Sequence, residues 1–229
     1  MSQFDNYGKI VMRVADWEGE VFRILDVNCI ILAGGKSARL GRNKLIEKVG
    51  GRNLLERVIN RLTCFGGEII IVTGQDSVLP DLNRYSGIKT INDIIHGKGS
   101  LGGLYSGLSV SDNQYNLVAA CDMPFLNLDL LKHMIDLANN YDAIVPMIKE
   151  YIEPLHAIYS KKCLPVIYSL MKENRLSISE LFSLINVRYV TAGEIDKYDP
   201  YHLSFFNINN EADLKAAREL AALEETNID

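Results

Sequence analysis

The feature that most constrains the fold of this chain is a short apolar run that ends in two adjacent glycines. Residues 30–33 are apolar, Gly34 and Gly35 follow, and the cations Arg39 and Lys44 come soon after. An apolar run before glycines is typical of a buried strand that opens into a loop, where glycines let the backbone approach a ligand. Exposed N–H groups in such a loop bind anions, helped by the positive end of a following helix. We therefore expect the chain to bind a nucleotide, with Arg39 and Lys44 neutralising phosphate charge.

Two common glycine-rich motifs do not match this loop. A P-loop requires a glycine at position 30, where Ile30 stands. The dinucleotide-binding fingerprint separates its glycines, whereas the two glycines here are adjacent. A tight strand-to-helix turn with solvated cations is the alternative to a ligand loop. The register of Arg39, Gly41 and Lys44 favours the ligand loop.

Composition limits the classes of function. The chain has 229 residues, of which 48% are hydrophobic and 23% charged, which suits one α/β domain with a sizeable core. A net charge of −5 argues against a general nucleic-acid-binding protein. Four widely spaced cysteines fit neither a zinc site nor a disulfide framework, so we expect reduced thiols. No apolar run reaches the roughly 18 residues of a membrane helix, and no signal peptide is recognisable, so we expect a cytoplasmic protein with no membrane partner.

Strand-like and helix-like segments alternate along the chain. Apolar runs predict strands at residues 28–33, 68–73, 88–91, 117–120 and 143–146. Helical spacing predicts helices at residues 53–62, from residue 104 onward, and at residues 128–138. This alternation predicts a mostly parallel sheet covered by helices. We expect residues 1–27 to be an N-terminal extension of unknown role and residues 28–229 to form a single domain.

Asp122 is the second candidate site residue. It follows the apolar run 117–121 and precedes Met123 and Pro124. Ligands of parallel sheets bind beyond the carboxyl ends of the strands, so Asp122 and the glycine loop should share one edge of the sheet. Mg²⁺ is commonly held by one or two carboxylates together with phosphate oxygens and water. We expect Asp122 to hold Mg²⁺, and a turn or helix-capping role is the structural alternative.

A third expected strand ends at Asn92 and Asp93, and a glycine-rich segment, residues 97–103, follows it. We expect Asp93 to hold a ribose hydroxyl or an amino edge of a base. Two interpretations of the glycines stay open, a backbone that lies close to a ligand and a mobile loop.

Near the C-terminus, residues 205–210 predict a strand that ends in amide side chains. Asn210 is a plausible N-cap for a helix that runs to about Leu223. Asn207 or Asn209 could instead reach the metal and phosphate region.

These segments together resemble one family in their order and residues. They are Leu32-Ala33-Gly34-Gly35, Arg39-Leu40-Gly41 with Lys44, Gly102-Gly103 with Ser106-Gly107-Leu108, Cys121-Asp122-Met123-Pro124-Phe125-Leu126, and Asn207-Ile208-Asn209. From about Cys29 to Leu220 the chain resembles the molybdenum cofactor guanylyltransferases. The resemblance implies a three-layer α/β/α, Rossmann-like nucleotide-diphospho-sugar transferase fold. It also implies that GTP and a molybdopterin-type molybdenum cofactor react, with Mg²⁺, to give the guanine dinucleotide cofactor and pyrophosphate.

The resemblance also implies roles for single residues. Leu32, Ala33 and Gly34 would contact the guanine through backbone groups, and Gly35 belongs to the same GTP-binding loop. Arg39 and Lys44 would hold phosphates, Asp93 the nucleoside and Asp122 the Mg²⁺, so that Arg39, Lys44 and Asp122 form the catalytic set. Acceptor-side contacts are expected from Gly102, Gly103, His156, Asn207 and Asn209. Molybdoenzymes or cofactor-insertion proteins are possible partners.

Some residues depart from the family's pattern or allow another interpretation. Arg42 and Asn43 precede Lys44 where an aspartate is common, which removes one charge partner. His156 is either an acceptor contact or a structural histidine. Lys161, Lys162, Lys172 and Arg175 either meet the anionic acceptor or form a solvated face.

Two other functions remain as alternatives. One is a cytidylyltransferase that acts on the same cofactor or on a sugar or polyol phosphate. Such enzymes usually carry alanine where Gly34 stands, which favours guanine here. The other is a nucleotide-binding protein without turnover, against which the joint presence of Lys44 and Asp122 argues.

Overall fold

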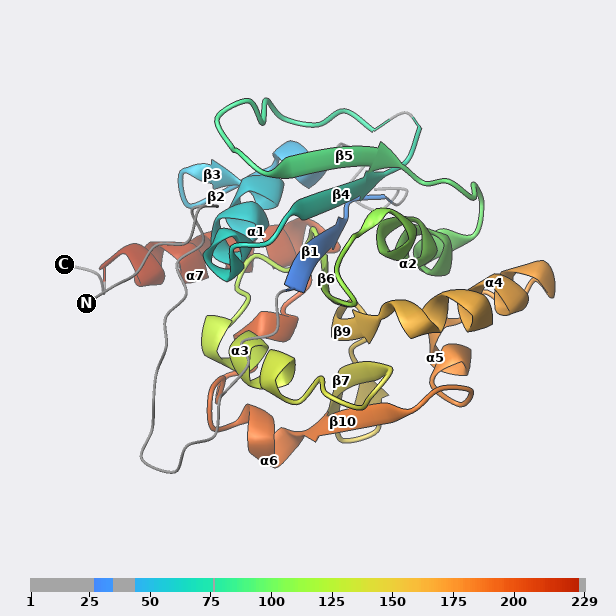
Figure 1. The fold of residues 1–229 in the computed structure, drawn as a ribbon. Helices are drawn as coiled ribbons and strands as arrows, with labels where there is room; N and C mark the ends of the chain where they lie inside the picture. Colours follow the sequence, from blue (N-terminus) through green and yellow to red (C-terminus); the bar gives the residue numbers. More distant parts are fainter. Residues whose placement is uncertain (1–26, 35–43, 76, 227–229) are drawn as a thin grey trace, which may run out of the picture.

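The computed structural model describes residues 27–34, 44–75 and 77–226, which are built around a sheet of eight strands (Figure 1). These strands are β1 (Val27–Leu32), β4 (Ile69–Thr73), β5 (Ile88–Asn92), β6 (Tyr115–Ala120), β7 (Ala143–Ile148), β8 (Tyr151–Ile152), β9 (His156–Ser160) and β10 (Val187–Thr191). Their order is β10-β7-β9-β6-β1-β4-β5, and β8 pairs with β7. The expected extension, residues 1–27, lies outside the described residues except for Val27, which begins β1.

Most neighbouring strands run parallel, as predicted. β1 pairs in parallel with β4 and β6, β4 with β5, and β7 with β10. The carboxyl ends of β1, β4, β5 and β6 therefore meet at one edge of the sheet. β9 is antiparallel to both β6 and β7, and no strand was predicted at its residues.

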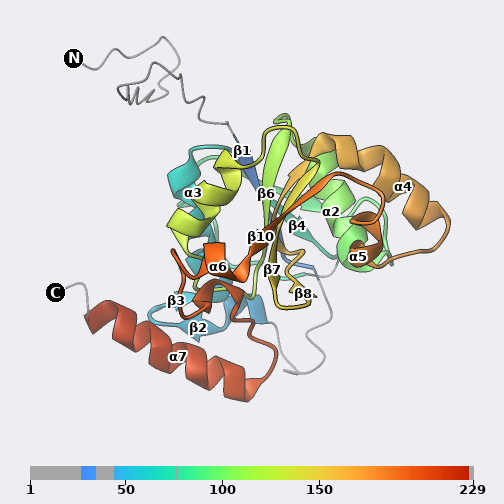
Figure 2. The ribbon, with the colours of Figure 1, turned by 90° about the horizontal axis from the view of Figure 1, so that it is seen from below.

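Helices cover both faces of the sheet, which confirms the three-layer arrangement (Figure 2). α1 (Leu54–Leu62) and α3 (Leu128–Asp136) lie on one face, and α2 (Gly99–Val110), α4 (Leu164–Lys172) and α5 (Ile178–Leu181) lie on the other. Side chains alternate between the faces along a strand. Ile31 accordingly packs with α1 and α3, while Ile30 packs with α2 and α4. Both isoleucines are fully buried, so β1 lies at the centre of the two apolar cores.

α1 begins where the sequence predicts, and α2 does not. Asn53 caps α1, since its side chain accepts from the Glu56 amide while the Glu56 carboxylate accepts from the Asn53 amide. α2 was expected from residue 104 but starts at Gly99, so five of the seven residues of the glycine-rich segment are helical. The helix packs closely on the sheet: a Cβ at Gly107 would lie 2.5 Å from Ile30 Cγ2. Small residues let α2 approach β1.

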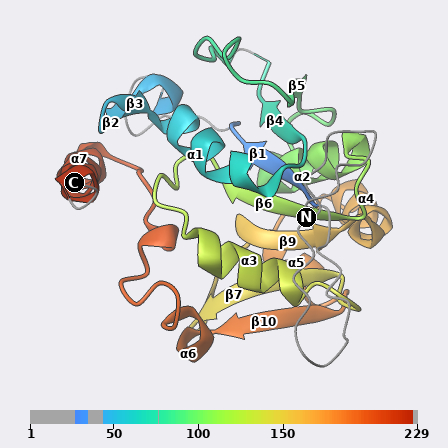
Figure 3. The ribbon, with the colours of Figure 1, turned by 60° about the vertical axis from the view of Figure 1, so that its left-hand side comes forward.

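The C-terminal helix α7 (Glu211–Thr226) lies beside α1 and the two-stranded ribbon of β2 (Lys48–Val49) and β3 (Arg52–Asn53), outside the central layers (Figure 3). The predicted cap is confirmed, because Asn210 Oδ1 accepts from the Asp213 amide at 3.0 Å. The short elements are η1 (Lys44–Ile46), η2 (Thr63–Phe65), η3 (Lys161–Cys163), α6 (Ala192–Ile195) and η4 (Leu203–Phe205). In the described ranges, no helix is long and apolar enough to cross a membrane.

The strand predicted at residues 205–210 is wrong. Residues 203–205 form η4, and residues 206–210 lie outside the sheet. Ile208 is fully buried with Leu54 and Phe125, and its amide donates to the carbonyl of Asp122 at 3.1 Å. The apolar residues of this segment thus anchor a loop to the strand edge instead of pairing in the sheet.

Candidate active site

A cavity of about 290 Å³ opens at the carboxyl ends of β1, β4, β5 and β6, beside the start of α2. Its walls include six residues that the sequence analysis selected: Leu32, Gly34, Lys44, Asp93, Gly103 and Asp122. They come from five separate segments of the chain. The edge of the sheet that was predicted to bind a ligand therefore contains a cavity, and this cavity is lined by both acidic and basic side chains.

The first strand ends in a fixed backbone. The carbonyl of Leu32 accepts from the Cys121 amide at 3.2 Å, and the Ala33 amide donates to the Val72 carbonyl at 2.8 Å. Gly34 is exposed, and a Cβ there would lie 3.5 Å from the Gly74 nitrogen, an ordinary contact. The described residues thus leave room for a side chain at this position. Gly35 and Arg39 lie outside the described residues.

Lys44 and Asp122 form an ion pair in the cavity. Lys44 Nζ lies 2.5 Å from Asp122 Oδ2, and the two side chains are 20% and 15% exposed. Lys44 is the first residue of η1, whose Leu45 is buried in the core, and Asp122 follows β6. The pair places a cation and an anion where a phosphate and a metal ion could each replace one partner. It also gives Lys44 a charge partner in place of the aspartate that is missing before it.

Asp93 is held by hydrogen bonds just beyond β5. Its amide donates to the Thr73 carbonyl at 2.8 Å. Its Oδ1 accepts from Ser106 Oγ at 2.7 Å and from the Ile95 amide at 3.1 Å. A carboxylate on a cavity wall can accept hydrogen bonds from a nucleoside, which is the role expected for Asp93.

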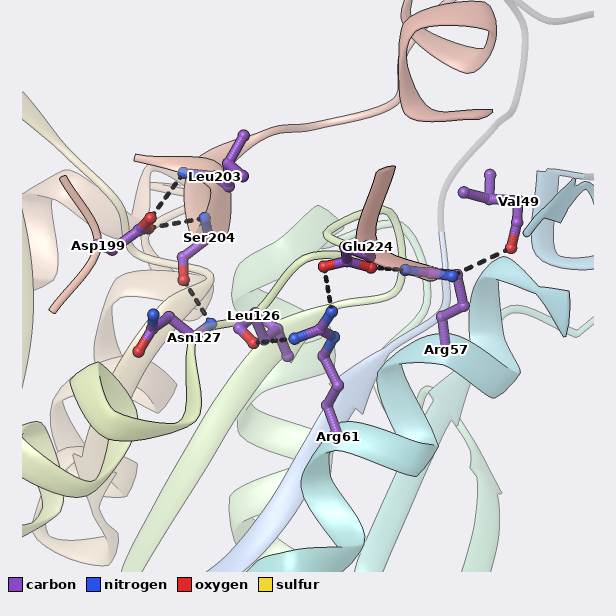
Figure 4. Close-up of polar contacts among 9 residues, drawn as sticks. All are labelled: Val49, Arg57, Arg61, Leu126, Asn127, Asp199, Leu203, Ser204 and Glu224. Carbon is purple, nitrogen blue, oxygen red and sulfur yellow. Dashed lines mark hydrogen bonds and ion pairs between the residues drawn. The ribbon is translucent and has the colours of Figure 1, made fainter. Parts of the chain in front are cut away.

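The loop that follows Asp122 is fastened to the C-terminal part of the chain (Figure 4). Arg61 of α1 donates to the Leu126 carbonyl at 2.9 Å and pairs with Glu224 of α7 at 2.6 Å. The Ile208 amide bonds the carbonyl of Asp122 itself, as described above. Helix α7 therefore contributes to the position of the acidic residue at the cavity.

A second anchor lies at the far end of the same loop (Figure 4). The Asn127 amide donates to Ser204 Oγ at 2.6 Å, and the buried Asp199 accepts from the amides of Leu203 and Ser204. Asn127 also caps α3, since its side chain accepts from two amides of the first turn. The loop is thus fixed at both ends.

Some residues expected on the acceptor side lie away from the cavity. His156 is fully buried in β9 beside the Phe205 ring, at 4.8 Å between centroids, and burial lowers its pKa to about 4. Neither of its ring nitrogens has a hydrogen-bond partner among the described residues. Asn207 and Asn209 flank Ile208 near Asp122 but do not line the cavity. Of the five residues expected on the acceptor side, which also include Gly102 and Gly103, only Gly103 lines the cavity.

The four cations that might meet an acceptor are also elsewhere. Lys161 and Lys162 follow β9, and β9 runs antiparallel to β6, so they lie at the edge opposite Asp122. Lys172 stacks over the Tyr168 ring at 4.6 Å, and Arg175 pairs with Glu173 and Glu180. These contacts agree with the alternative of a solvated face.

Sequence reasoning missed several residues of the site. Thr73, Gly74, Ser100 and Leu155 line the cavity, and Ser106 contacts Asp93. The ends of the expected strands at residues 68–73 and 88–91 were a usable signal for Thr73 and Gly74. Leu155 stands directly before His156, in a segment (residues 153–156) that resembles the one lining the acceptor side in the family, so the resemblance was the signal for it.

The chain is similar to known nucleotidyltransferases over most of its length. The family model described as "MobA-like NTP transferase domain" matches residues 29–185. A probable molybdenum cofactor guanylyltransferase of Peptoclostridium acidaminophilum is 32% identical, over 87% of this chain and 92% of the relative. A molybdenum cofactor guanylyltransferase of Desulfosudis oleivorans is 34% identical, over 83% of this chain and 94% of the relative. The crystal structure of molybdopterin-guanine dinucleotide biosynthesis protein A from Archaeoglobus fulgidus superimposes with a TM-score of 0.73 at 28% identity, covering 86% of this chain and all of that one.

Proposed function

Because the chain belongs to the MobA-like NTP transferase family, we propose that it transfers GMP from GTP to a molybdopterin-type molybdenum cofactor and releases pyrophosphate. The observation that carries the proposal is the Lys44–Asp122 pair in the cavity at the carboxyl ends of the strands. A tight turn with solvated cations, the alternative to a ligand loop, does not account for a partly buried cation and anion 2.5 Å apart. The guanylyltransferase relatives span nearly the whole chain, which favours this reaction over cytidylyl transfer.

The proposed step is a displacement at phosphorus. A terminal phosphate oxygen of the acceptor attacks the α-phosphorus of GTP, a new P–O–P link forms, and the bond to the β-phosphate breaks. Pyrophosphate leaves with that bonding pair. The chain contributes by positioning the reactants and neutralising charge, without a covalent intermediate.

Lys44 is the phosphate-binding cation in this proposal. A lysine 4 Å from a phosphate charge interacts by roughly 4 kcal/mol at an effective dielectric of 20, before desolvation is subtracted. Removal of Lys44 should therefore lower turnover on the order of a hundredfold. Arg39 is proposed as a second phosphate contact.

Asp122 is the residue we assign to Mg²⁺. The donor set suits the ion, since Mg²⁺ binds through one or two carboxylates and fills its shell with phosphate oxygens and water. No group of three or more metal-binding side chains occurs among the residues that the structure describes, so we propose that Asp122 and the phosphates of GTP hold the ion together. When bound, Mg²⁺ supplies positive charge to the phosphate oxygens. Asp122 would hold the ion, and Lys44, no longer paired with Asp122, would be free to bind phosphate.

Backbone groups of Leu32, Ala33 and Gly34 are proposed to contact the guanine. Gly34 is exposed at the cavity, and its neighbours Gly74 and Thr73 leave space for a Cβ. The absence of a side chain at Gly34 therefore serves a ligand rather than protein packing. Asp93 is proposed to accept hydrogen bonds from the nucleoside.

We propose the cytoplasm as the place of action. All four cysteines are free thiols, and three of them are buried. Disulfides are rare in the cytosol, so unpaired cysteines agree with this compartment.

The proposal is tested by supplying the protein with Mg²⁺, molybdenum cofactor and GTP, CTP or ATP separately. Pyrophosphate release is expected with GTP and cofactor together. Release with CTP alone would replace the guanine assignment by cytosine. Nucleotide binding without release would favour the alternative of a binding protein without turnover.

A further inference from the structure

The carboxylate of Asp93 rests on a buried hydroxyl of helix α2. Ser106 has no exposed surface, and its Oγ lies 2.7 Å from Asp93 Oδ1. Ser106 belongs to the middle of α2, thirteen residues after Asp93, and is not part of the cavity wall. A fully buried serine that meets a cavity carboxylate therefore acts on the cavity through Asp93.

The hydrogen bonds of Ser106 set the direction of its single proton. Its Oγ accepts from the Ile94 amide at 2.9 Å, and two acceptors lie near it, Asp93 Oδ1 at 2.7 Å and the Gly102 carbonyl at 2.9 Å. Bonds to a carboxylate are shorter and stronger than bonds to a neutral carbonyl. The Ser106 hydroxyl therefore donates its hydrogen bond to Asp93, while the Ile94 amide holds the hydroxyl oxygen in place.

Gly102 lies close to the second oxygen of the same carboxylate. A Cβ at Gly102 would lie 2.9 Å from Lys98 Cβ, 3.0 Å from the Ile95 carbonyl oxygen and 3.1 Å from Asp93 Oδ2, so the close packing here leaves little room for a side chain. Among the described residues, Oδ1 takes both side-chain hydrogen bonds of Asp93 and Oδ2 takes none. The carboxylate is thus held at one oxygen, and the other oxygen stays available to a donor in the cavity.

We infer that Ser106 is a positioning residue for nucleoside recognition, which orients Asp93 so that Oδ2 accepts a hydrogen bond from the nucleoside. The inference rests on the proposed use of GTP. A carboxylate can only accept, so the partner must be a donor. Guanine offers its ring N–H and 2-amino group, and the ribose offers two hydroxyls.

The test compares Ser106→Ala with Ser111→Ala by calorimetric titration of MgGTP. Ser111 is a matched control because it is also a buried serine with side-chain hydrogen bonds, to Asn28 and Asn116, and lies at the other end of α2. Ser106→Ala should raise the Kd for MgGTP about tenfold, equivalent to about 1.4 kcal/mol. Ser111→Ala should lower the melting temperature and leave the Kd unchanged.

A double-mutant cycle separates positioning from general loosening. In an Asp93→Ala background, adding Ser106→Ala should change the Kd by less than about twofold, because the residue through which it acts is gone. A full tenfold loss in that background would overturn the inference, as would wild-type affinity in Ser106→Ala. If Ser106→Ala does not fold, Ser106→Cys keeps a side chain of similar shape but replaces the hydroxyl by a weak S–H donor, so it should weaken MgGTP binding in the same direction, and wild-type affinity there would refute the inference.

Nucleotide analogues identify the donor. If Oδ2 meets the 2-amino group of guanine, the loss in Ser106→Ala should disappear with ITP, which lacks that group. If it meets the ribose 2′-hydroxyl, the loss should disappear with 2′-deoxy-GTP, and a loss that persists with both analogues assigns the partner to the ring N–H or the 3′-hydroxyl. If the wild type binds no GTP, the proposed function is refuted. If the wild type and Ser106→Ala bind GTP equally well, only this inference is refuted.

Discussion

Replacing Asp122 by asparagine should have opposite effects on turnover and on metal-free GTP binding. The change keeps the size of the side chain and removes its charge. Lys44 then loses the partner that lies 2.5 Å away and becomes free to bind phosphate. In the presence of Mg²⁺, however, the ligand assigned to the metal ion is lost. Turnover should therefore fall at least a hundredfold, while GTP binding in EDTA becomes tighter.

The ion-pair geometry sets the size of the second effect. Two unit charges 2.5 Å apart interact by about 7 kcal/mol at an effective dielectric of 20. The side chains are 20% and 15% exposed, so screening by water and the cost of desolvating the two charges offset most of this attraction. A net coupling of about 1.4 kcal/mol corresponds to a tenfold change in affinity. We expect metal-free GTP to bind Asp122→Asn about tenfold more tightly than the wild type.

Titration calorimetry in EDTA measures the affinity, and pyrophosphate release with Mg²⁺ measures the turnover. Asp129→Asn is the matched control, because Asp129 pairs with Lys132 on the surface, where the side chains are 72% and 60% exposed. It should change neither quantity. Weaker metal-free binding in Asp122→Asn would show that Asp122 does not compete for Lys44. Normal turnover with Mg²⁺ would show that the metal assignment is wrong.

Two further changes test other parts of the account. Gly34→Ala should raise the KM for GTP while costing less than about 1 kcal/mol of folding free energy, because a Cβ there meets the Gly74 nitrogen only at 3.5 Å. Steady-state kinetics measures the KM, and thermal melting measures the stability. An equal loss of binding for every nucleotide would indicate a damaged loop instead. His156→Leu should reduce the loss of stability in acid. Burial lowers the pKa of His156 from its ordinary value of 6.5 to about 4, so the stability that depends on the neutral imidazole is fully present above pH 6.5 and is lost as the pH falls from 6.5 to about 4, by about 3 kcal/mol in all. Urea unfolding at pH 7 and pH 4 measures the slope, and an unchanged slope in the variant would contradict the assignment.

Local patterns were enough to predict much of the fold. The apolar runs at β1, β4 and β6 are buried along their length except for Tyr115, and continuous burial is what a central parallel strand requires. α1 was predictable because its apolar residues recur at helical spacing, and all of them are buried in the structure. Such patterns depend only on neighbours in the sequence.

Elements that depend on distant partners were not predictable. β9 contains His156, Tyr159 and Ser160, and two of these polar side chains are satisfied outside the strand: Tyr159 donates to the Pro154 carbonyl, and Ser160 accepts from Gln114. His156 is buried without a hydrogen-bond partner among the described residues and packs beside the Phe205 ring. The strand expected at residues 205–210 failed for the converse reason, since its apolar side chains pack against a loop and α7.

The candidate site was predicted as a set of residue types and not as a geometry. Lys44, Asp93 and Asp122 were selected because each follows a glycine loop or an apolar run, and the structure brings all three to one cavity. Their partners could not be inferred. Lys44 and Asp122 are 78 residues apart, and the bond from Ser106 to Asp93 joins a helix to a strand end.

The most direct test of the central claim follows the α-phosphate of GTP. The protein is incubated with Mg²⁺, molybdenum cofactor and GTP labelled with ³²P at the α or the γ position, and the products are separated. We expect the α label in the cofactor dinucleotide and the γ label in pyrophosphate, with both products formed at least a hundredfold more slowly by Asp122→Asn. The α label remaining in free nucleotide while the wild type binds GTP would contradict guanylyl transfer.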